Sequence, residues 1–178
     1  VIGIDIIQSQ LISTFLFYCG IGGMLVASVL AISQRDIRRM VAYSSVAQVS
    51  YVYIGIGMGT MAGVTAALFQ MLAHSAAKPL LFLSTGELVR VSGDHKRFHY
   101  LHGAGYRNVL AGVVFTFSAM SMVGIPFTGG FIAKLQIALA SMPFRGATRT
   151  LVLVSLAVST LLNAVYFLHT VVSIYRKA

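Results

Sequence analysis

A histidine and a lysine stand inside an apolar stretch of the sequence, Ala66–Phe82, which reads AALFQMLAHSAAKPLLF. His74 and Lys78 are four residues apart, so they share one face of a helix, and Gln70 lies on that face one turn earlier. A charged lysine near the centre of a bilayer costs at least ~2.5–3.5 kcal/mol. Because burial disfavours the charged form of a lysine, such a residue can bind and release a proton near neutral pH. We therefore interpret this stretch as a proton-handling element.

A second lysine, Lys134, lies in another apolar segment, one turn after Gly129 and Gly130. Glycines at that point let a helix begin late or break, which frees backbone groups near the ammonium. Two lysines and one histidine in otherwise apolar segments are candidates for a proton relay. Two plainer interpretations stand beside this one. Either lysine can extend its ammonium to the membrane surface, and His74 can serve only as a hydrogen-bonding residue between helices.

Other polar residues are weaker candidates. Glu87 is the acidic residue near the apolar end of a span, and it is equally consistent with a proton-entry carboxylate and with a loop residue. Asp36 is expected to form a surface ion-pair group with Arg38 and Arg39. Three further histidines lie in a basic loop without a nearby cysteine, so a polar loop is favoured over a metal site: His95, His99 and His102.

Composition indicates a polytopic membrane protein. Of 178 residues, 57% are hydrophobic and only 10% are charged, whereas soluble domains carry roughly 25% charged residues. The net charge of +9 is concentrated in short loops, which indicates membrane orientation rather than a nucleic-acid partner. The one cysteine, Cys19, cannot form a disulfide or a cysteine-ligated iron–sulfur cluster within the chain. No phosphate loop, Ser–His–Asp set or dinucleotide fingerprint is present.

The elements that must position these residues are helices, so the sequence predicts an all-α fold. Apolar runs indicate about six transmembrane segments in a single transmembrane domain, residues 1–178. The predicted segments are Leu11–Ser33, Met40–Gly57, Met61–Leu83, Asn108–Pro126, Phe131–Met142 and Thr150–Tyr175. The fifth is short, which predicts a broken or tilted helix. Pro79 removes a backbone N–H, which predicts a kink near Ser75–Lys78.

Six crossings also predict an orientation. They place three basic segments on one side of the membrane: Arg35–Arg39, Arg90–Arg107 and Arg145–Arg149. The uncharged turns at Gly57–Gly59 and Pro126–Gly130 fall on the other side, as the positive-inside rule requires. In this arrangement Arg176 and Lys177 are on the wrong side.

Three motifs stand out in the sequence: DIRRMVAYSSVAQVSY at Asp36–Tyr51, the His74 and Lys78 pair in AHSAAKPLLF, and GIPFTGGFIAKL at Gly124–Leu135. Together they resemble the antiporter-like subunits of respiratory complex I, the proton-pumping NADH:quinone oxidoreductase. They occur in the family's order and cover almost the whole chain. The resemblance implies the C-terminal part of such a subunit, including much of the second of two inverted five-helix repeats. It implies a membrane-arm subunit that carries part of a proton path.

The resemblance also implies roles for individual residues. Lys134 matches the relay lysine or glutamate of the family's broken helix. Lys78 matches the relay lysine between the repeats, and His74 matches the histidine one turn before it. Gln70 stands where some relatives carry a second histidine. Arg38 stands where several carry lysine, and because arginine stays protonated a titrating role there is in doubt.

The resemblance implies no cofactor in this chain, with flavin, iron–sulfur clusters and quinone in partner subunits. It favours subunit 2, with similarity to subunit 5 and to D-type subunits of multisubunit sodium/proton antiporters. The family's first repeat is absent from this sequence, so a separate chain is expected to supply the N-terminal half, alongside other membrane-arm subunits and membrane lipids. The expected location is the mitochondrial inner membrane, or alternatively a bacterial plasma membrane.

Two other functions are consistent with the same residues. One is a subunit of a multisubunit cation/proton antiporter without a redox role. The other is a structural assembly subunit whose relay has decayed. A carrier of small molecules is disfavoured, because only half of an inverted-repeat pair is present.

Overall fold

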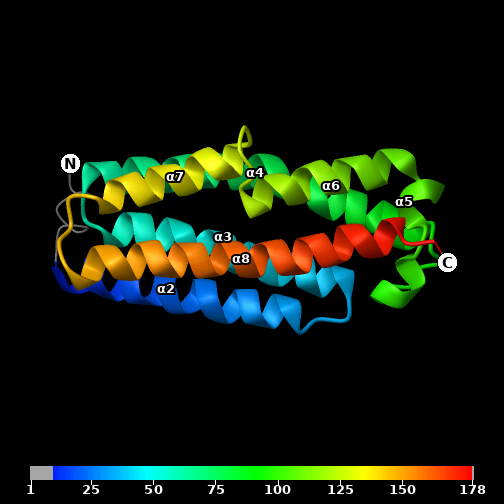
Figure 1. Ribbon diagram of the computed structural model, residues 1–178, viewed down its shortest axis with the longest axis horizontal. Helices are drawn as coiled ribbons and strands as arrows, with labels where there is room; N and C mark the ends of the chain where they lie inside the picture. Colours follow the sequence, from blue (N-terminus) through cyan, green and yellow to red (C-terminus); the bar gives the residue numbers. More distant parts are fainter. Residues whose placement is uncertain (1–9, 178) are drawn as a thin grey trace.

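The structure is a computed structural model that describes residues 10–177, and its long helices lie side by side along one axis (Figure 1). The predicted all-α fold is confirmed. The elements are α2 (Gln10–Ile32), α3 (Ile37–Gly57), α4 (Met61–Arg90), η1 (Phe98–Leu101), α5 (Ala104–Arg107), α6 (Val109–Val123), α7 (Gly129–Ser141) and α8 (Ala147–Tyr175). Over the described residues the sole extended pairing is a single bridge between Asp36 and Arg97.

Three helices are long and apolar enough to cross a membrane: α2, α4 and α8. The 30 residues of α4 and the 29 of α8 exceed the ~20 that a hydrocarbon core of ~30 Å requires. Many of their large apolar side chains face outwards, among them Leu72, Leu83 and Val172. Such faces suit lipid or neighbouring membrane helices rather than water. The prediction of a membrane protein is confirmed.

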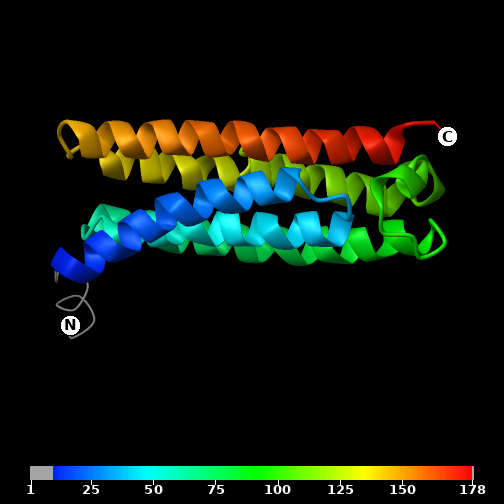
Figure 2. The same cartoon turned by 90° about the horizontal axis from the view of Figure 1, so that it is seen from below.

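The helices α6 and α7 lie end to end along the bundle, and the loop between them is at mid-length (Figures 1 and 2). Together they form one broken crossing, which confirms the predicted short or broken helix. The prediction that Asn108–Pro126 and Phe131–Met142 cross separately is wrong. With 15 and 13 residues at 1.5 Å per residue, each helix is only roughly 20 Å long and cannot span the core alone.

This correction changes the predicted orientation. Arg145 and Arg149 lie beside the start of α8, at the opposite end of the bundle from α5 (Figure 1). Arg176 and Lys177 follow the end of α8, on the α5 side, together with the other basic loop residues. The expected exception at the C-terminus therefore disappears, and the excess of basic residues places the α5 end on the inner side of the membrane.

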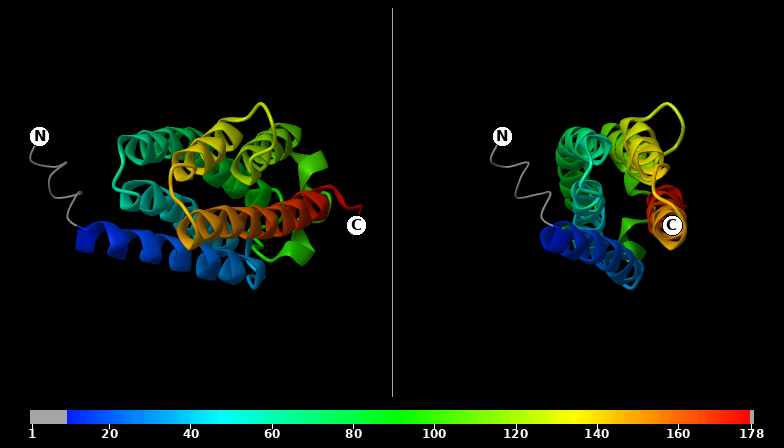
Figure 3. Two further views of the ribbon diagram at one scale, coloured as in Figure 1. Left: turned by 60° about the vertical axis from the view of Figure 1, so that its left-hand side comes forward. Right: turned by 90° about the vertical axis from the view of Figure 1, so that its left-hand side faces the viewer.

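The helix α3 lies at the centre of the packing. It contacts α2, α4, α7 and α8, and the end-on view shows it between α2 and α4, with α7 and α8 across from it (Figure 3, right). Close approach of α2 depends on small residues, because a Cβ at Gly20 would lie 2.8 Å from the backbone nitrogen of Ile54. Lys78, Gln70 and Lys134, described below, each contact a residue of α3.

Two helix boundaries differ from the prediction. The helix α4 continues to Arg90, beyond the predicted end at Leu83, and it runs without interruption across Pro79. The predicted kink of this helix near Ser75–Lys78 stays a prediction. Asp36 accepts hydrogen bonds from the backbone nitrogens of Arg38 (2.8 Å) and Arg39 (3.4 Å). It therefore caps α3, and the expected ion-pair group at this position is wrong.

Candidate functional site

Lys78 is buried between α4 and α3. Its Nζ donates to the carbonyl oxygen of Val41 at 2.7 Å and to Oγ of Ser44 at 2.6 Å. Ser44 in turn donates to the same Val41 carbonyl at 2.8 Å, so its hydroxyl is free to accept from the lysine. The side chain is only 5% exposed. The plainer interpretation, in which this lysine extends its ammonium to the membrane surface, does not fit the structure.

Lys134 is buried at the break between α6 and α7, with 6% of its surface exposed. Its Nζ donates to the carbonyl oxygens of Met122 (3.2 Å) and Val123 (2.6 Å). Because α6 ends at Val123, these carbonyls lack a donor from a following helical turn. A helix C-terminus also carries partial negative charge, which favours a cation there. The predicted freeing of backbone groups near Lys134 is confirmed, and the groups are the last carbonyls of α6.

Glycines shape this break. Gly124 closes α6 with φ of +90°, a conformation that side-chain-bearing residues rarely adopt. Gly130, in the first turn of α7, lies so close to α6 that a Cβ would overlap the carbonyl oxygen of Ser121. The two half-helices therefore meet closely enough for Lys134 to reach the end of α6.

We expect Gly130→Ala to destabilise the assembled protein by about 1–3 kcal/mol, because a backbone oxygen cannot move aside as a flexible side chain can. The measurement is the temperature at which the chain is lost from its purified complex. Gly22→Ala is the matched control, since a Cβ at Gly22 meets nothing within 4 Å. Equal loss temperatures for the two variants would contradict the packing argument.

A stripe of polar side chains on α3 lies between the two lysines. Gln48 Nε2 donates to the Met122 carbonyl at 3.1 Å, the same oxygen that Lys134 contacts. Its Oε1 accepts from Gln70 Nε2 of α4 at 2.9 Å. Ser44, Gln48 and Tyr51 are spaced i, i+4 and i+7, so they share one face of α3. The site thus joins α3, α4, α6 and α7.

Polar atoms without partners continue this stripe on α4. His74 Nδ1 and Gln70 Oε1 are buried and accept or donate no hydrogen bond. Ser44 and Tyr51, which contact the two lysines, are seven residues apart on α3, or roughly 10 Å along the helix. Direct contact between the lysines is therefore excluded, and Gln48, Gln70 and His74 lie in the interval. Within residues 10–177, neither lysine forms an ion pair with an acidic side chain.

Residues 1–163 match the family described as "NADH:quinone oxidoreductase/Mrp antiporter, TM". The chain belongs to this family. The match covers both lysines and the whole polar stripe.

Relatives in this family include two kinds of bacterial subunit. The chain is 36% identical over 155 residues to NADH-quinone oxidoreductase subunit N of Desulforudis audaxviator, covering 87% of this chain and 30% of the relative. It is 33% identical over 165 residues to subunit M of Rickettsia prowazekii, covering 90% of this chain and 32% of the relative. The chain therefore spans about a third of the length of these relatives. Assignment to subunit 2 remains a prediction.

Solved structures show the same fold. A chain of the membrane-bound sulfane sulfur reductase, an archaeal respiratory membrane complex, superposes with a TM-score of 0.82 at 27% identity, covering 92% of this chain and 33% of that one. A chain of the Mrp complex from Dietzia sp. DQ12-45-1b also gives 0.82, at 28% identity, covering 93% and 31%. The antiporter-like fold is thereby confirmed.

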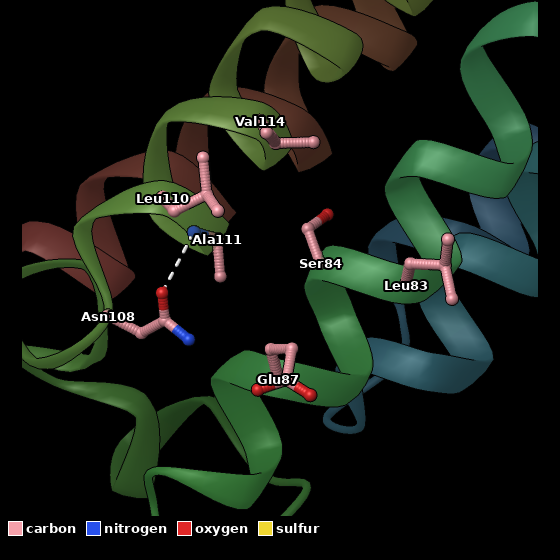
Figure 4. A pocket seen from close by; sticks show the side chains of 7 residues that line it. All are labelled: Leu83, Ser84, Glu87, Asn108, Leu110, Ala111 and Val114. Atoms are coloured by element: carbon pink, nitrogen blue, oxygen red, sulfur yellow. Dashed lines mark hydrogen bonds between the residues drawn. The ribbon is translucent and has the colours of Figure 1, made fainter.

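Glu87, the fourth predicted site residue, does not join the lysines. It lines a pocket of about 310 Å³ between α4 and α6 with Ser84 and Asn108, as Figure 4 shows. Its carboxylate pairs with Arg90 at 2.7 Å. Nine residues separate it from Lys78 on α4, a rise of roughly 13 Å. The structure places His74 and Lys78 at one end of the polar stripe and Lys134 at the other end. Glu87 lies apart from all three.

Three site residues were missed by sequence reasoning: Ser44, Gln48 and Tyr51. Their i, i+4, i+7 spacing within an apolar span was the available signal, because it places polar groups on one buried face. The loop histidines have ordinary aromatic contacts, such as His95 stacked on Tyr100 with ring centroids 4.4 Å apart.

Proposed function

We propose that the chain carries part of a proton-translocation path in the membrane arm of a proton-pumping NADH:quinone oxidoreductase. The observation that carries this proposal is the pair of buried lysines, each hydrogen-bonded to uncharged oxygens and joined by polar side chains of α3 and α4. Ionisable residues inside a membrane are costly, and proton relays are one of the functions that retain them. The family membership supports the same role.

The proposed path runs from Lys78 to Lys134. A change of charge in a neighbouring subunit alters the proton affinity of Lys78, whose ammonium releases a proton and becomes a neutral amine. The proton passes through water and His74, past Gln70 and Gln48, and Lys134 binds it when its amine is neutral. Buried polar atoms such as His74 Nδ1 and Gln70 Oε1 are commonly satisfied by ordered water in proteins. The proton then leaves on one face of the membrane.

The redox chemistry belongs to other subunits in this proposal. A cysteine-ligated iron–sulfur cluster is assigned to other subunits because Cys19, the one cysteine of this sequence, cannot ligate a cluster by itself. We propose the same location for flavin and quinone because of the resemblance to the complex I subunits. The relatives contain a further part that this chain does not match, and we propose that residues of that part complete the path. The proposed location is the mitochondrial inner membrane, with a bacterial plasma membrane as the alternative.

A second function is a subunit of a multisubunit cation/proton antiporter without a redox role. The similarity to a chain of an Mrp complex supports it. The same two lysines and the same polar stripe would serve a redox-linked proton pump or a cation/proton antiporter. The partner subunits therefore distinguish the two functions.

We expect an affinity-tagged form of the chain to purify with flavin- and iron–sulfur-containing subunits and with NADH oxidation activity. The measurement combines the visible absorption spectrum of the purified complex, its subunit composition and its rate of NADH oxidation. Purification with other membrane subunits that exchange sodium for protons, without flavin or iron, would support the antiporter instead.

A further inference from the structure

A second polar cluster lies behind the stripe, where α2, α3 and α8 meet. Its members are Ser28, Tyr51, Ser159, Asn163 and Tyr166, none more than 3% exposed. The Tyr51 hydroxyl donates to Ser159 Oγ at 2.9 Å and accepts from Asn163 Nδ2 at 3.4 Å. Asn163 Oδ1 in turn accepts from the Tyr166 hydroxyl at 2.7 Å. Ser28 of α2 adds contacts to Ser159 (3.2 Å) and Asn163 (3.3 Å).

These bonds fix the ring of Tyr51. A tyrosine side chain has two torsions, and hydrogen bonds at its far end restrict both. The anchors Ser159 and Asn163 belong to α8, whereas Tyr51 belongs to α3. The position of the ring therefore depends on how α8 sits against α3.

The fixed ring faces Lys134. The Nζ atom lies 5.4 Å from the centroid of the Tyr51 ring, within the ~6 Å range of a cation–π contact. From α6 the ammonium meets the carbonyls of Met122 and Val123. Within the described residues, α4 and α8 place no charged group against it, and no acidic side chain pairs with it. Tyr51 is the titratable side chain that faces Lys134 from α3.

We propose that Tyr51 is a positioning residue that holds the Lys134 ammonium at the helix break and favours its protonated form. The proposal rests on the proposed function of Lys134 as a proton relay. The ring contributes through the negative face of its π-system, not through its hydroxyl, which is directed to α8. Because α8 supplies the anchors, displacement of α8 alters how firmly Lys134 keeps its proton.

The test replaces Tyr51 in the intact complex by phenylalanine and by mono-, di- and trifluorinated phenylalanine. All members of the series lack the hydroxyl and therefore its bonds to Ser159 and Asn163, so they differ only in the ring face. Fluorine withdraws the negative charge of that face while adding little volume. The measurement is NADH-driven proton uptake by membrane vesicles as a function of pH. A weaker ring lets Lys134 lose its proton at lower pH, so the alkaline limb of the profile moves to lower pH. The expected displacement from phenylalanine to the trifluorinated ring is about one pH unit.

A profile that does not change across the fluorinated series overturns the proposal. The same substitutions at Phe117, an outward-facing residue of α6, are the matched control and should leave the profile in place. Lys134→Met in the same assay distinguishes a failure of the proposed function from a failure of the role of Tyr51. If that variant pumps protons normally, the proposed function fails; if it does not pump and the series is flat, only the role of Tyr51 fails.

Discussion

Replacement of Lys134 by methionine is expected to lower NADH-driven proton translocation about 100-fold, the scale on which a positioned proton-transfer group acts. Methionine keeps the unbranched apolar stem of lysine but cannot bind a proton. The path then ends at the break between α6 and α7, where the lysine ammonium otherwise contacts the carbonyls of Met122 and Val123. The measurement is proton uptake by vesicles, divided by the rate of NADH oxidation in the same sample.

The variant must be distinguished from one that fails to assemble. Gln48 still donates to the Met122 carbonyl, so only the Val123 carbonyl loses its donor, at a cost of about 1–3 kcal/mol. Complex content is therefore measured on native gels. Lys96→Met, at an exposed loop lysine, is the control and should pump normally. Normal pumping by Lys134→Met at normal complex content would contradict the relay.

The sequence was sufficient to predict the all-α membrane fold and the polar face of α4. Long apolar runs predict membrane helices, because inside a bilayer every backbone N–H and C=O group must form a hydrogen bond within the protein. The spacing of Gln70, His74 and Lys78 determines a shared face whatever the tertiary packing. Gly129 and Gly130, which precede Lys134, predicted a helix break from the local sequence alone, and the structure has this break between α6 and α7.

The pairing of α6 and α7 was not predicted because it depends on tertiary contacts. Asn108–Pro126 is long enough to cross a membrane, but α6 ends at Val123, and the loop that follows lies halfway along the bundle (Figure 1). The acceptors of Lys134 lie 11 and 12 residues earlier in the chain, a separation that no local pattern encodes. Asp36 is different: an aspartate directly before a helix is a known capping signal, which the neighbouring arginines obscured.

Lys78 gives the second large effect, and two substitutions distinguish its possible roles. Lys78→Met removes both the charge and the donor, and we expect an approximately 100-fold loss of coupled proton translocation. Lys78→Arg keeps a permanent cation that can donate to Val41 and Ser44, but a guanidinium does not release its proton in proteins. If Lys78 must titrate, the arginine variant fails as the methionine variant does.

The contrast between these variants tests the mechanism more sharply than either alone. A lysine that only joins α4 to α3 through hydrogen bonds would be replaced adequately by arginine, and pumping would return. Ser44→Ala offers a graded comparison, because it removes one of the two acceptors and leaves the Val41 carbonyl. It should reduce proton uptake less than either substitution of Lys78, since the amine can still gain and lose its proton. Recovery of pumping in Lys78→Arg would assign Lys78 to structure and require another residue to carry the proton across α4.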